Sequence, residues 1–309
     1  MTPLAVVTGF LGAGKTTLIG RLLANPAWSR TAVIVNEFGD IPLDHHLIAS
    51  ADETLMALTT GCLCCAVQTD LARTLLALHR RRVSGEIAFD RVVIETSGLA
   101  DPAPILHALM TDPKLIEIYA IAAILTLVDA ELGEATMARH PEAWRQVALA
   151  DRILLTKTDR VRPGDGLISA IRALNPTASI TTSADDPPAL FSAPPVLPPV
   201  PSPRVAHSGD VNAVIVTRDV PLPAVALPLW LEALTRAIGN DLLRLKGLVD
   251  LIEFPSQPAM LHAVQHVVAP IDLLPAWPGT RQTWIVLIGR NLDADYPAAL
   301  LQQIIDRID

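Results

Sequence analysis

The sequence has no excess of positive charge. Its 309 residues carry a net charge of −8, with a pI near 5.5. An acidic chain is a poor general partner for nucleic acid or for an anionic membrane surface. A nucleotide is not excluded, because a single lysine, a metal ion and backbone amides can meet its charge locally.

The sequence also lacks a long, unbroken apolar run. The longest stretch, 116–128, contains Glu117 and is better explained as a buried strand with its approach. Met1 precedes a β-prone run by only a few residues, which leaves no room for a secretory signal peptide. We therefore expect a cytoplasmic protein with no membrane partner.

Cysteine is scarce, and all three cysteines fall within four positions, at Cys62, Cys64 and Cys65. An odd, clustered set is a poor disulfide framework. Thiolates are soft ligands for Zn²⁺, Cu(I) and other late transition metals. Three sulfurs leave a tetrahedral metal one exchangeable position, which suits delivery better than a closed structural site. The alternatives are small buried side chains or a redox pair, although the spacing is C-x-C-C and not C-x-x-C.

Apolar strands alternate with helical segments over the first part of the chain. Near-continuous Val, Ile and Leu runs are typical of strands covered on both faces, and the alternation predicts an α/β fold with a mostly parallel sheet. Ligand groups should then gather at the carboxyl ends of the strands. The expected strands are 4–8, 31–36, 55–58, 91–95, 121–129 and 152–156.

A proline-dense stretch divides the sequence. Residues 185–203 contain too much proline for a helix and suit an extended, semi-rigid linker. We predict a nucleotide-binding domain at 1–184, a linker at 185–204 and a small C-terminal α+β domain at 205–309, in a split βαβ arrangement. Its expected strands are 211–218, 247–254, 260–268 and 283–289, and its expected helices are 223–238 and 296–305.

The segment from Gly9 to Thr16 reads G-x-x-x-x-G-K-T, the phosphate-binding P-loop pattern, between a β-prone run and a helical one. Glycines let backbone N–H groups turn around phosphate oxygens, and the helix N-terminus adds its positive dipole end. The alternative is a strand–helix turn that binds nothing. Lys15 is expected to reach the β- and γ-phosphates as a catalytic residue, and the Thr16 hydroxyl to ligate Mg²⁺. The predicted nucleotide-binding residues of this segment are Gly9, Gly12, Ala13, Gly14, Lys15, Thr16 and Thr17.

An acid ends the apolar run at 91–95 and a glycine follows three residues later. Glu95 is expected to hold Mg²⁺ through water, opposite Thr16, and so to act in catalysis. The Gly98 N–H can contact a γ-phosphate, which makes the following residues a nucleotide-sensing loop. An acid after a strand is otherwise often a simple cap.

Thr156, Lys157 and Asp159 form a T-K-x-D version of the N-K-x-D guanine reader, after an apolar run at 152–155. A carboxylate at Asp159 can accept hydrogen bonds from guanine N1–H and the exocyclic amine, which adenine does not offer in the same way. Lys157 can pack its stem along the purine. The alternative is a helix cap followed by a solvated lysine.

Polar residues also follow the expected strand at 31–36. Glu37, Asp44, His45 and His46 are candidates for a fourth metal ligand, and Glu37 and His45 stand first because they fall in a switch-like loop. Glu37 is also the candidate for positioning the attacking water. His262 and His266 would form a zinc pair only on a helix, and their neighbours favour a strand.

Together these residues resemble the CobW-type GTPases, metal-chaperone relatives of HypB and UreG. The resemblance rests on residues 9–17, 36–40, 61–65, 95–102 and 156–159, and it continues at 243–247, 262–266 and 284–289. It implies a P-loop G domain of the SIMIBI type, GTP hydrolysis, and metal carried by the cysteine motif.

The sequence therefore predicts a Mg²⁺-dependent GTPase that couples nucleotide state to metal transfer, with slow intrinsic turnover. Zn²⁺ is the first expectation for the metal, with Co²⁺ and Ni²⁺ as alternatives. The expected partner is a client metalloprotein, and an oligomer that depends on nucleotide or metal is left open. Two other functions stay open: a GTP-switched interaction module with a structural zinc, and a P-loop small-molecule kinase.

Overall fold

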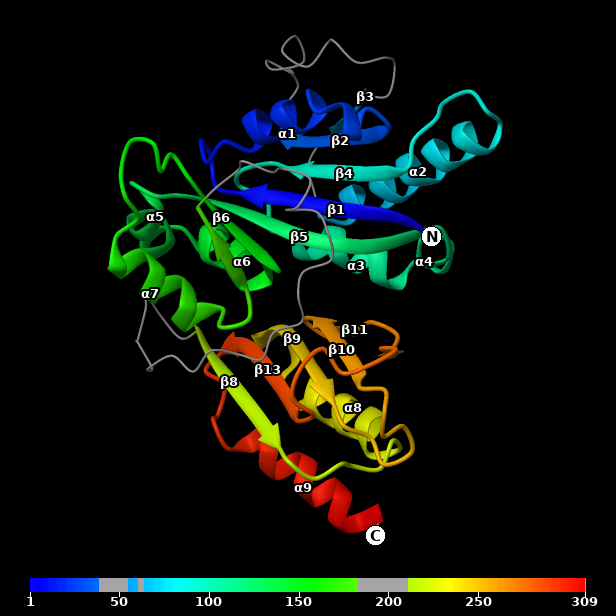
Figure 1. Cartoon of the computed structure of the whole chain (residues 1–309), viewed down its shortest axis with the longest axis vertical. Helices are drawn as coiled ribbons and strands as arrows, with labels where there is room; N and C mark the ends of the chain where they lie inside the picture. Colours follow the sequence, from blue (N-terminus) through cyan, green and yellow to red (C-terminus); the bar gives the residue numbers. More distant parts are fainter. Residues whose placement is uncertain (39–54, 61–63, 183–210, 309) are drawn as a thin grey trace. The chain divides into compact units, whose positions relative to one another are not determined.

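Parallel strands form the first sheet of the computed structural model, which describes residues 1–38, 55–60, 64–182 and 211–308 (Figure 1). Within those residues the sheet has seven strands, and every neighbouring pair is parallel. Their carboxyl ends therefore share one edge. In spatial order the strands are β3 (Leu55–Thr60), β2 (Thr31–Phe38), β4 (Arg91–Thr96), β1 (Thr2–Gly9), β5 (Tyr119–Asp129), β6 (Arg152–Thr156) and β7 (Ser179–Thr181).

Helices cover both faces of this sheet, which explains why its strands are apolar almost throughout. On one face, α1 packs Leu18 and Leu22 against Val7 and Leu127. Residues alternate along a strand, so Thr126 points to the other face. There its hydroxyl donates to the backbone oxygen of Gln146 in α6, at 2.8 Å. The helices are α1 (Lys15–Leu23), η1 (Pro26–Trp28), α2 (Cys64–Val83), α3 (Ala103–Thr111), α4 (Pro113–Ile118), α5 (Gly133–Arg139), α6 (Pro141–Leu149) and α7 (Asp165–Leu174).

The second sheet is antiparallel and has six strands in the described part of the chain, in the order β11-β10-β9-β13-β8, with β12 paired to β10. β13 lies between β8 and β9, which α8 connects, so the predicted split βαβ arrangement is present. Trp230 of α8 is fully buried, and its Nε1 donates to the oxygen of Pro297 in α9 at 2.9 Å. The elements are β8 (Val211–Arg218), α8 (Ala226–Ile238), η4 (Gly239–Asp241), β9 (Leu242–Val249), β10 (Ala259–Val264), β11 (Val267–Val268), β12 (Asp272–Leu273), β13 (Thr283–Arg290) and α9 (Tyr296–Ile308).

The chain divides into two compact units. One consists of Met1–Leu167 with Ala178–Pro194, and the other of Ile168–Thr177 with Pro195–Asp309. The α/β fold with a mostly parallel sheet and the small α+β domain are both confirmed. The boundaries at 184 and 204 stay predictions, because 183–210 lies outside the described residues.

Several strands differ from their sequence-based bounds. The prediction of a single strand at 260–268 was wrong, because a turn at Gln265 and His266 divides it into β10 and β11. The prediction of a strand at 247–254 was wrong, since β9 ends at Val249 and Ile252 and Phe254 are exposed. The charged residues Arg244 and Lys246 interrupt the apolar pattern of β9, so the pattern placed the strand too late in the sequence. β2 and β3 run two residues further than expected, because they pair with each other up to Phe38 and Thr60. β7 had no strand prediction.

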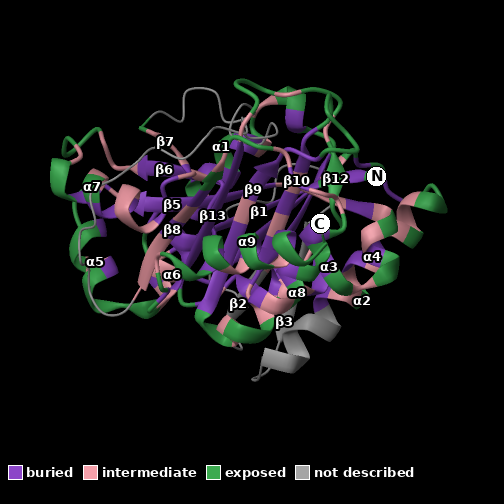
Figure 2. Cartoon of the chain, turned by 90° about the horizontal axis from the view of Figure 1, so that it is seen from below, coloured by how far each residue is buried: buried purple, intermediate pink, exposed green. Residues whose placement is uncertain are grey.

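The strands of the first sheet are largely buried, whereas the outward faces of its helices are exposed. Figure 2 shows β5 and β6 in the buried colour, while the outward faces of α5 and α7 are exposed. None of the helices in the described residues is long and apolar enough to cross a membrane.

Candidate functional site

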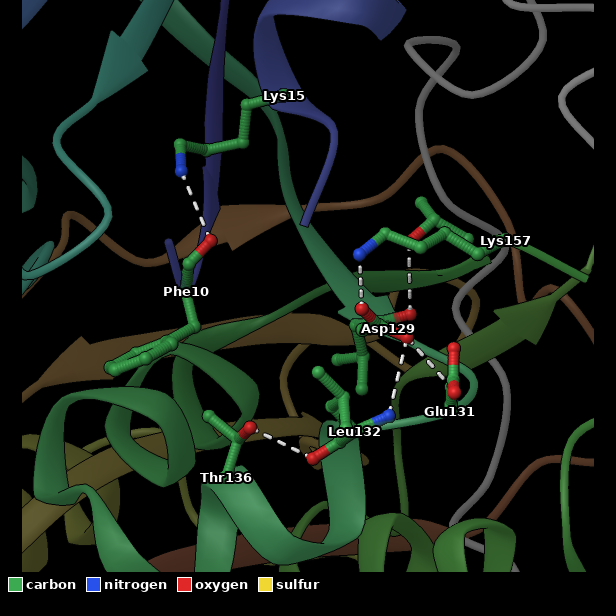
Figure 3. A network of polar contacts seen from close by, with 9 residues as sticks. Phe10, Lys15, Asp129, Glu131, Leu132, Thr136 and Lys157 are labelled. Carbon is green, nitrogen blue, oxygen red and sulfur yellow. Dashed lines mark hydrogen bonds and ion pairs between the residues drawn. The ribbon is translucent and has the colours of Figure 1, made fainter. Parts of the chain in front are cut away.

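The P-loop lies where β1 ends and α1 begins. Its Lys15 is only 8% exposed, and the Nζ atom donates to the backbone oxygens of Gly9 at 2.8 Å and Phe10 at 3.3 Å. Figure 3 shows this ammonium group turned toward the Phe10 carbonyl. The side chain is thus folded back over its own loop, where a phosphate group would be bound.

Gly9 is required by close packing as well as by backbone conformation. Its φ is +142°, and a Cβ there would lie 2.5 Å from the Leu127 oxygen of the neighbouring strand β5. No side chain fits at that distance, so the start of the P-loop can lie directly against the sheet.

Thr16 and Glu95 meet across the end of the sheet. The Thr16 hydroxyl donates to Glu95 Oε1 at 2.9 Å, and Glu95 is only 4% exposed. A hydrogen bond between Thr96 and Thr8, 2.8 Å long, ties β4 to β1 beside them. A buried carboxylate next to a hydroxyl is a set of hard oxygen donors, which fits Mg²⁺. The two residues predicted to face each other do so.

The loop after β4 packs against the P-loop. A Cβ on Gly98 would lie 2.7 Å from the nitrogen and 2.8 Å from the Cα of Leu11. Only glycine allows this approach. The expected nucleotide-sensing loop therefore touches the phosphate-binding loop through backbone atoms.

A cavity of about 710 Å³ joins the P-loop to the segment Thr156–Asp159. Two motifs that are far apart in the sequence thus form one site. On the far side, the Thr158 hydroxyl donates to the oxygen of Thr182 at 3.2 Å. The lining residues are Gly12, Ala13, Gly14, Thr17, Leu18, Arg21, Leu154, Leu155, Thr156, Lys157, Thr158, Asp159, Arg160 and Thr182.

Lys157 is held by an acid that the sequence reasoning missed. Its Nζ forms an ion pair with Asp129 Oδ2 at the end of β5, as Figure 3 shows. Lys157 has a φ of 58°, a conformation that few residues other than glycine adopt. Asp129 Oδ1 also accepts from the N–H groups of Glu131 at 2.8 Å and Leu132 at 3.2 Å. Asp129 therefore fixes the segment Thr156–Asp159, the predicted guanine reader, to the end of β5.

The pKa of Asp129 reflects these contacts. Burial disfavours its charged form, but the hydrogen bonds from Lys157 and the two backbone N–H groups outweigh burial and hold the pKa below its ordinary value. A carboxyl with a lowered pKa stabilises the folded state above its ordinary pKa. This contribution is lost as the pH falls through the lowered value.

Asp129→Ala should therefore cost about 1–2 kcal/mol of stability at neutral pH and weaken GTP binding about tenfold. The difference in stability from the parent should shrink below about pH 4. Thermal melts across pH and fluorescent-nucleotide titration measure both effects.

Asp293→Ala is the matched control for this variant. Asp293 accepts from two backbone N–H groups at the start of α9, and these lower its pKa. Its loss should reduce stability while leaving GTP affinity unchanged. If the Asp129→Ala variant binds GTP as tightly as the parent, Asp129 only caps the backbone N–H groups that follow β5 and does not support nucleotide binding.

The predicted metal residues are placed less completely. Cys64 and Cys65 are the first residues of α2, while Cys62 and His45 lie outside the described residues. β3 ends at Thr60 on the same edge of the sheet as β1 and β4, and α2 begins four residues later at Cys64. Within the described part, no three His, Cys, Asp or Glu residues are grouped so that they could hold a metal ion.

The expectation that Glu37 lies in a loop was wrong. It lies in β2, which pairs Glu37 with Thr59 of β3, because the neighbouring strand continues the hydrogen-bonding edge. His262 lies in strand β10 and His266 in the turn before β11, so the two do not form a helical pair. The strand preferred for His262 is confirmed.

Two family models match the chain. The nucleotide-binding domain of the CobW/HypB/UreG family matches residues 3–182, and the cobalamin synthesis protein CobW C-terminal domain matches residues 211–305. The chain belongs to the CobW family. The predicted resemblance is confirmed.

Individual relatives agree with this assignment. The chain is 35% identical to the zinc chaperone YjiA of Escherichia coli (strain K12), over 81% of this chain and 82% of that protein. It is 32% identical to the zinc-regulated GTPase metalloprotein activator 1 of Schizosaccharomyces pombe, over 52% of this chain and 39% of that protein. The crystal structure of Zn(II)-bound YjiA GTPase from E. coli has a TM-score of 0.75 and 28% identity, with 98% of each chain covered.

The residues missed in this CobW-family site carry weak sequence signals. Asp129 is an acid at the end of an apolar strand, which is one part of the pattern that singled out Glu95, but no glycine follows it three residues later. Thr182 follows a strand of only three residues, β7. Gln146, whose side chain donates to the backbone oxygens of Gly98 and Ala100, lies within helix α6. The last two could not be found from the sequence, because nothing beside them marks the site.

Proposed function

We propose that this chain carries a transition metal, zinc first, at its cysteine motif and couples GTP binding and hydrolysis to transfer of that metal to a client metalloprotein. The chain is a GTPase of the CobW family, and its relatives include a zinc chaperone and a zinc-regulated GTPase activator. The observation that carries the proposal is the single cavity shared by the P-loop and the Thr156–Asp159 segment.

The polar groups of the nucleotide site divide the binding and the chemistry between them in this proposal. Lys15 binds the β- and γ-phosphate oxygens, the Gly98 N–H binds the γ-phosphate, and Asp159 reads guanine. Thr16 and Glu95 hold Mg²⁺, which neutralises the charge that develops on the phosphates. Glu37 orients the attacking water, although its position in β2 was not expected.

Cys62, Cys64 and Cys65 are the proposed ligands of the transported metal, with Glu37 or His45 as the fourth. Zn²⁺ agrees with the names of the relatives, and Co²⁺ or Ni²⁺ can use the same ligand types. Since β3 and β4 end at one edge of the sheet, a GTP-dependent change after Gly98 can reach the motif that follows β3. The identity of the client, a nucleotide- or metal-dependent oligomer and a cytoplasmic location stay predictions.

Zinc titration of the reduced protein tests the coupling, with a GTP analogue, with GDP and without nucleotide. We expect zinc affinity to differ at least about fivefold between the two nucleotide states. Linkage requires zinc to change the affinity ratio of the two nucleotides by the same factor. A variant with serine at all three cysteine positions is the control and should show neither effect.

Identical zinc affinities in all three states would overturn the coupling. If removal of zinc by a chelator unfolds the nucleotide-binding domain, the zinc is structural and the chain is an interaction module. Transfer of the γ-phosphate from GTP to a metabolite would instead favour a kinase.

A further inference from the structure

Helix α6 supplies a buried side chain that holds the nucleotide-sensing loop. Gln146 is fully buried, and its Nε2 donates to the backbone oxygens of Gly98 at 3.2 Å and Ala100 at 3.0 Å. Both acceptors belong to the loop after β4. Backbone carbonyls in a buried setting need a donor, because an unpaired one loses the hydrogen bond that water would give.

The rest of the loop is fixed around these two bonds. The N–H of Ala100 donates to the oxygen of Ser97 at 3.1 Å, which closes a turn. Asp101 accepts from the N–H of Ala103 at 2.9 Å and forms an ion pair with Arg145 of α6 at 3.5 Å. Consecutive residues of α6, Arg145 and Gln146, thus hold consecutive parts of the loop.

The residue that precedes α6 also touches the P-loop. The His140 ring, just before α6, lies 4.6 Å from the Phe10 ring between centroids, at an interplanar angle of 31°. α6 is itself attached to the sheet, because the Thr126 hydroxyl of β5 donates to the Gln146 backbone oxygen. Helix α6 and the residue before it therefore form a fixed support that contacts both loops.

We propose that Gln146 is a positioning residue that keeps Gly98 against the P-loop, where its N–H can meet the terminal phosphate, and so sets the preference for GTP over GDP. This inference rests on the proposed GTP-dependent function. Gly98 already lies in contact with Leu11. A triphosphate reaches Gly98 and a diphosphate does not, so the loss of the amide should weaken GTP binding selectively.

Gln146→Met is the test, because methionine has nearly the same length but no N–H donor. Affinities for a non-hydrolysable GTP analogue and for GDP are measured by titration, and turnover is measured at saturating GTP. We expect the ratio of GTP-analogue to GDP affinity to fall about tenfold, and kcat to fall with it. In the nucleotide-free protein, amide exchange of residues 97–101 should become faster.

Thr126→Val is the matched control. It removes the hydrogen bond between β5 and the backbone of α6 and leaves the loop after β4 untouched. The variant should have a lower melting temperature but the same ratio of GTP-analogue to GDP affinity. If Gln146→Met does not fold, Gln146→Asn keeps the amide one methylene shorter and should lower the ratio by a smaller factor.

An unchanged ratio, or equal weakening of both nucleotides, would overturn the positioning role of Gln146. Failure of the proposed function has a different signature, since zinc affinity of the parent chain would then be the same with the GTP analogue, with GDP and without nucleotide. The amide-exchange result does not depend on nucleotide and decides the structural part of the inference in either case.

Discussion

Replacing Asp159 by asparagine is expected to turn a site for GTP into one for xanthosine triphosphate. In the proposed site, the Asp159 carboxylate accepts from guanine N1–H and from the exocyclic amine. Xanthine keeps the N1–H but has a carbonyl oxygen where guanine has the amine, and an asparagine N–H₂ can donate to that oxygen. We expect GTP affinity to fall about 10³-fold, because a donor would then face a donor. Asp159 is exposed where it lines the cavity, so the loss should be smaller than in an enclosed site.

Competition titrations with GTP, ATP and xanthosine triphosphate measure this switch. Asp165→Asn is the matched control, since Asp165 is another exposed aspartate nearby, at the start of α7, and does not line the cavity. It should leave all three affinities unchanged. If Asp159→Asn keeps the parent preference for GTP, the segment 156–159 is a structural turn and guanine is read elsewhere.

Lys15→Met is expected to reduce GTP hydrolysis about 10²–10³-fold, which is the usual effect of removing one preorganised donor from developing charge. The Lys15 ammonium is confined by the Gly9 and Phe10 carbonyls. It therefore moves only a short way to reach phosphate oxygens. Single-turnover release of phosphate at saturating GTP measures the chemical step apart from binding.

Arg21→Met serves as the control for this loss of charge. Arg21 lies on the same helix and also lines the cavity, so the variant removes one positive charge from the same region without altering the P-loop. Its turnover should stay within a few-fold of that of the parent, because a solvent-screened surface charge contributes little energy. Near-normal turnover in Lys15→Met would mean that the P-loop binds phosphate without catalysing its transfer.

The parts of the site that the sequence revealed are those encoded by contiguous residues. The P-loop needs only a strand, eight residues and a helix. The parallel sheet then brings Glu95 to Thr16, and Asp159 to the cavity that the P-loop lines. Alternation of strands and helices was sufficient for this, since strand ends in a parallel sheet converge whatever the loop lengths.

The contacts that escaped prediction join residues that are distant in the sequence and have no motif. Asp129 binds Lys157, and Gln146 binds backbone oxygens at Gly98 and Ala100. Every residue type has a backbone carbonyl, so the amino acid at a position does not reveal that its carbonyl oxygen accepts a hydrogen bond. Glu37 was misplaced for a related reason, because the length of β2 depends on its pairing with β3 and not on its own composition.

The position of Trp144 gives the protein an optical reporter of its own. Trp144 precedes Arg145 in α6, and the Arg145 guanidinium lies 5.4 Å from the centre of its ring. The same guanidinium is paired with Asp101 in the nucleotide-sensing loop. In the proposed function the loop moves with the nucleotide state, which would shift a positive charge next to an indole, and indole emission responds to nearby charge. We therefore expect intrinsic fluorescence to follow the nucleotide state, with Trp144→Phe identifying the source of the signal.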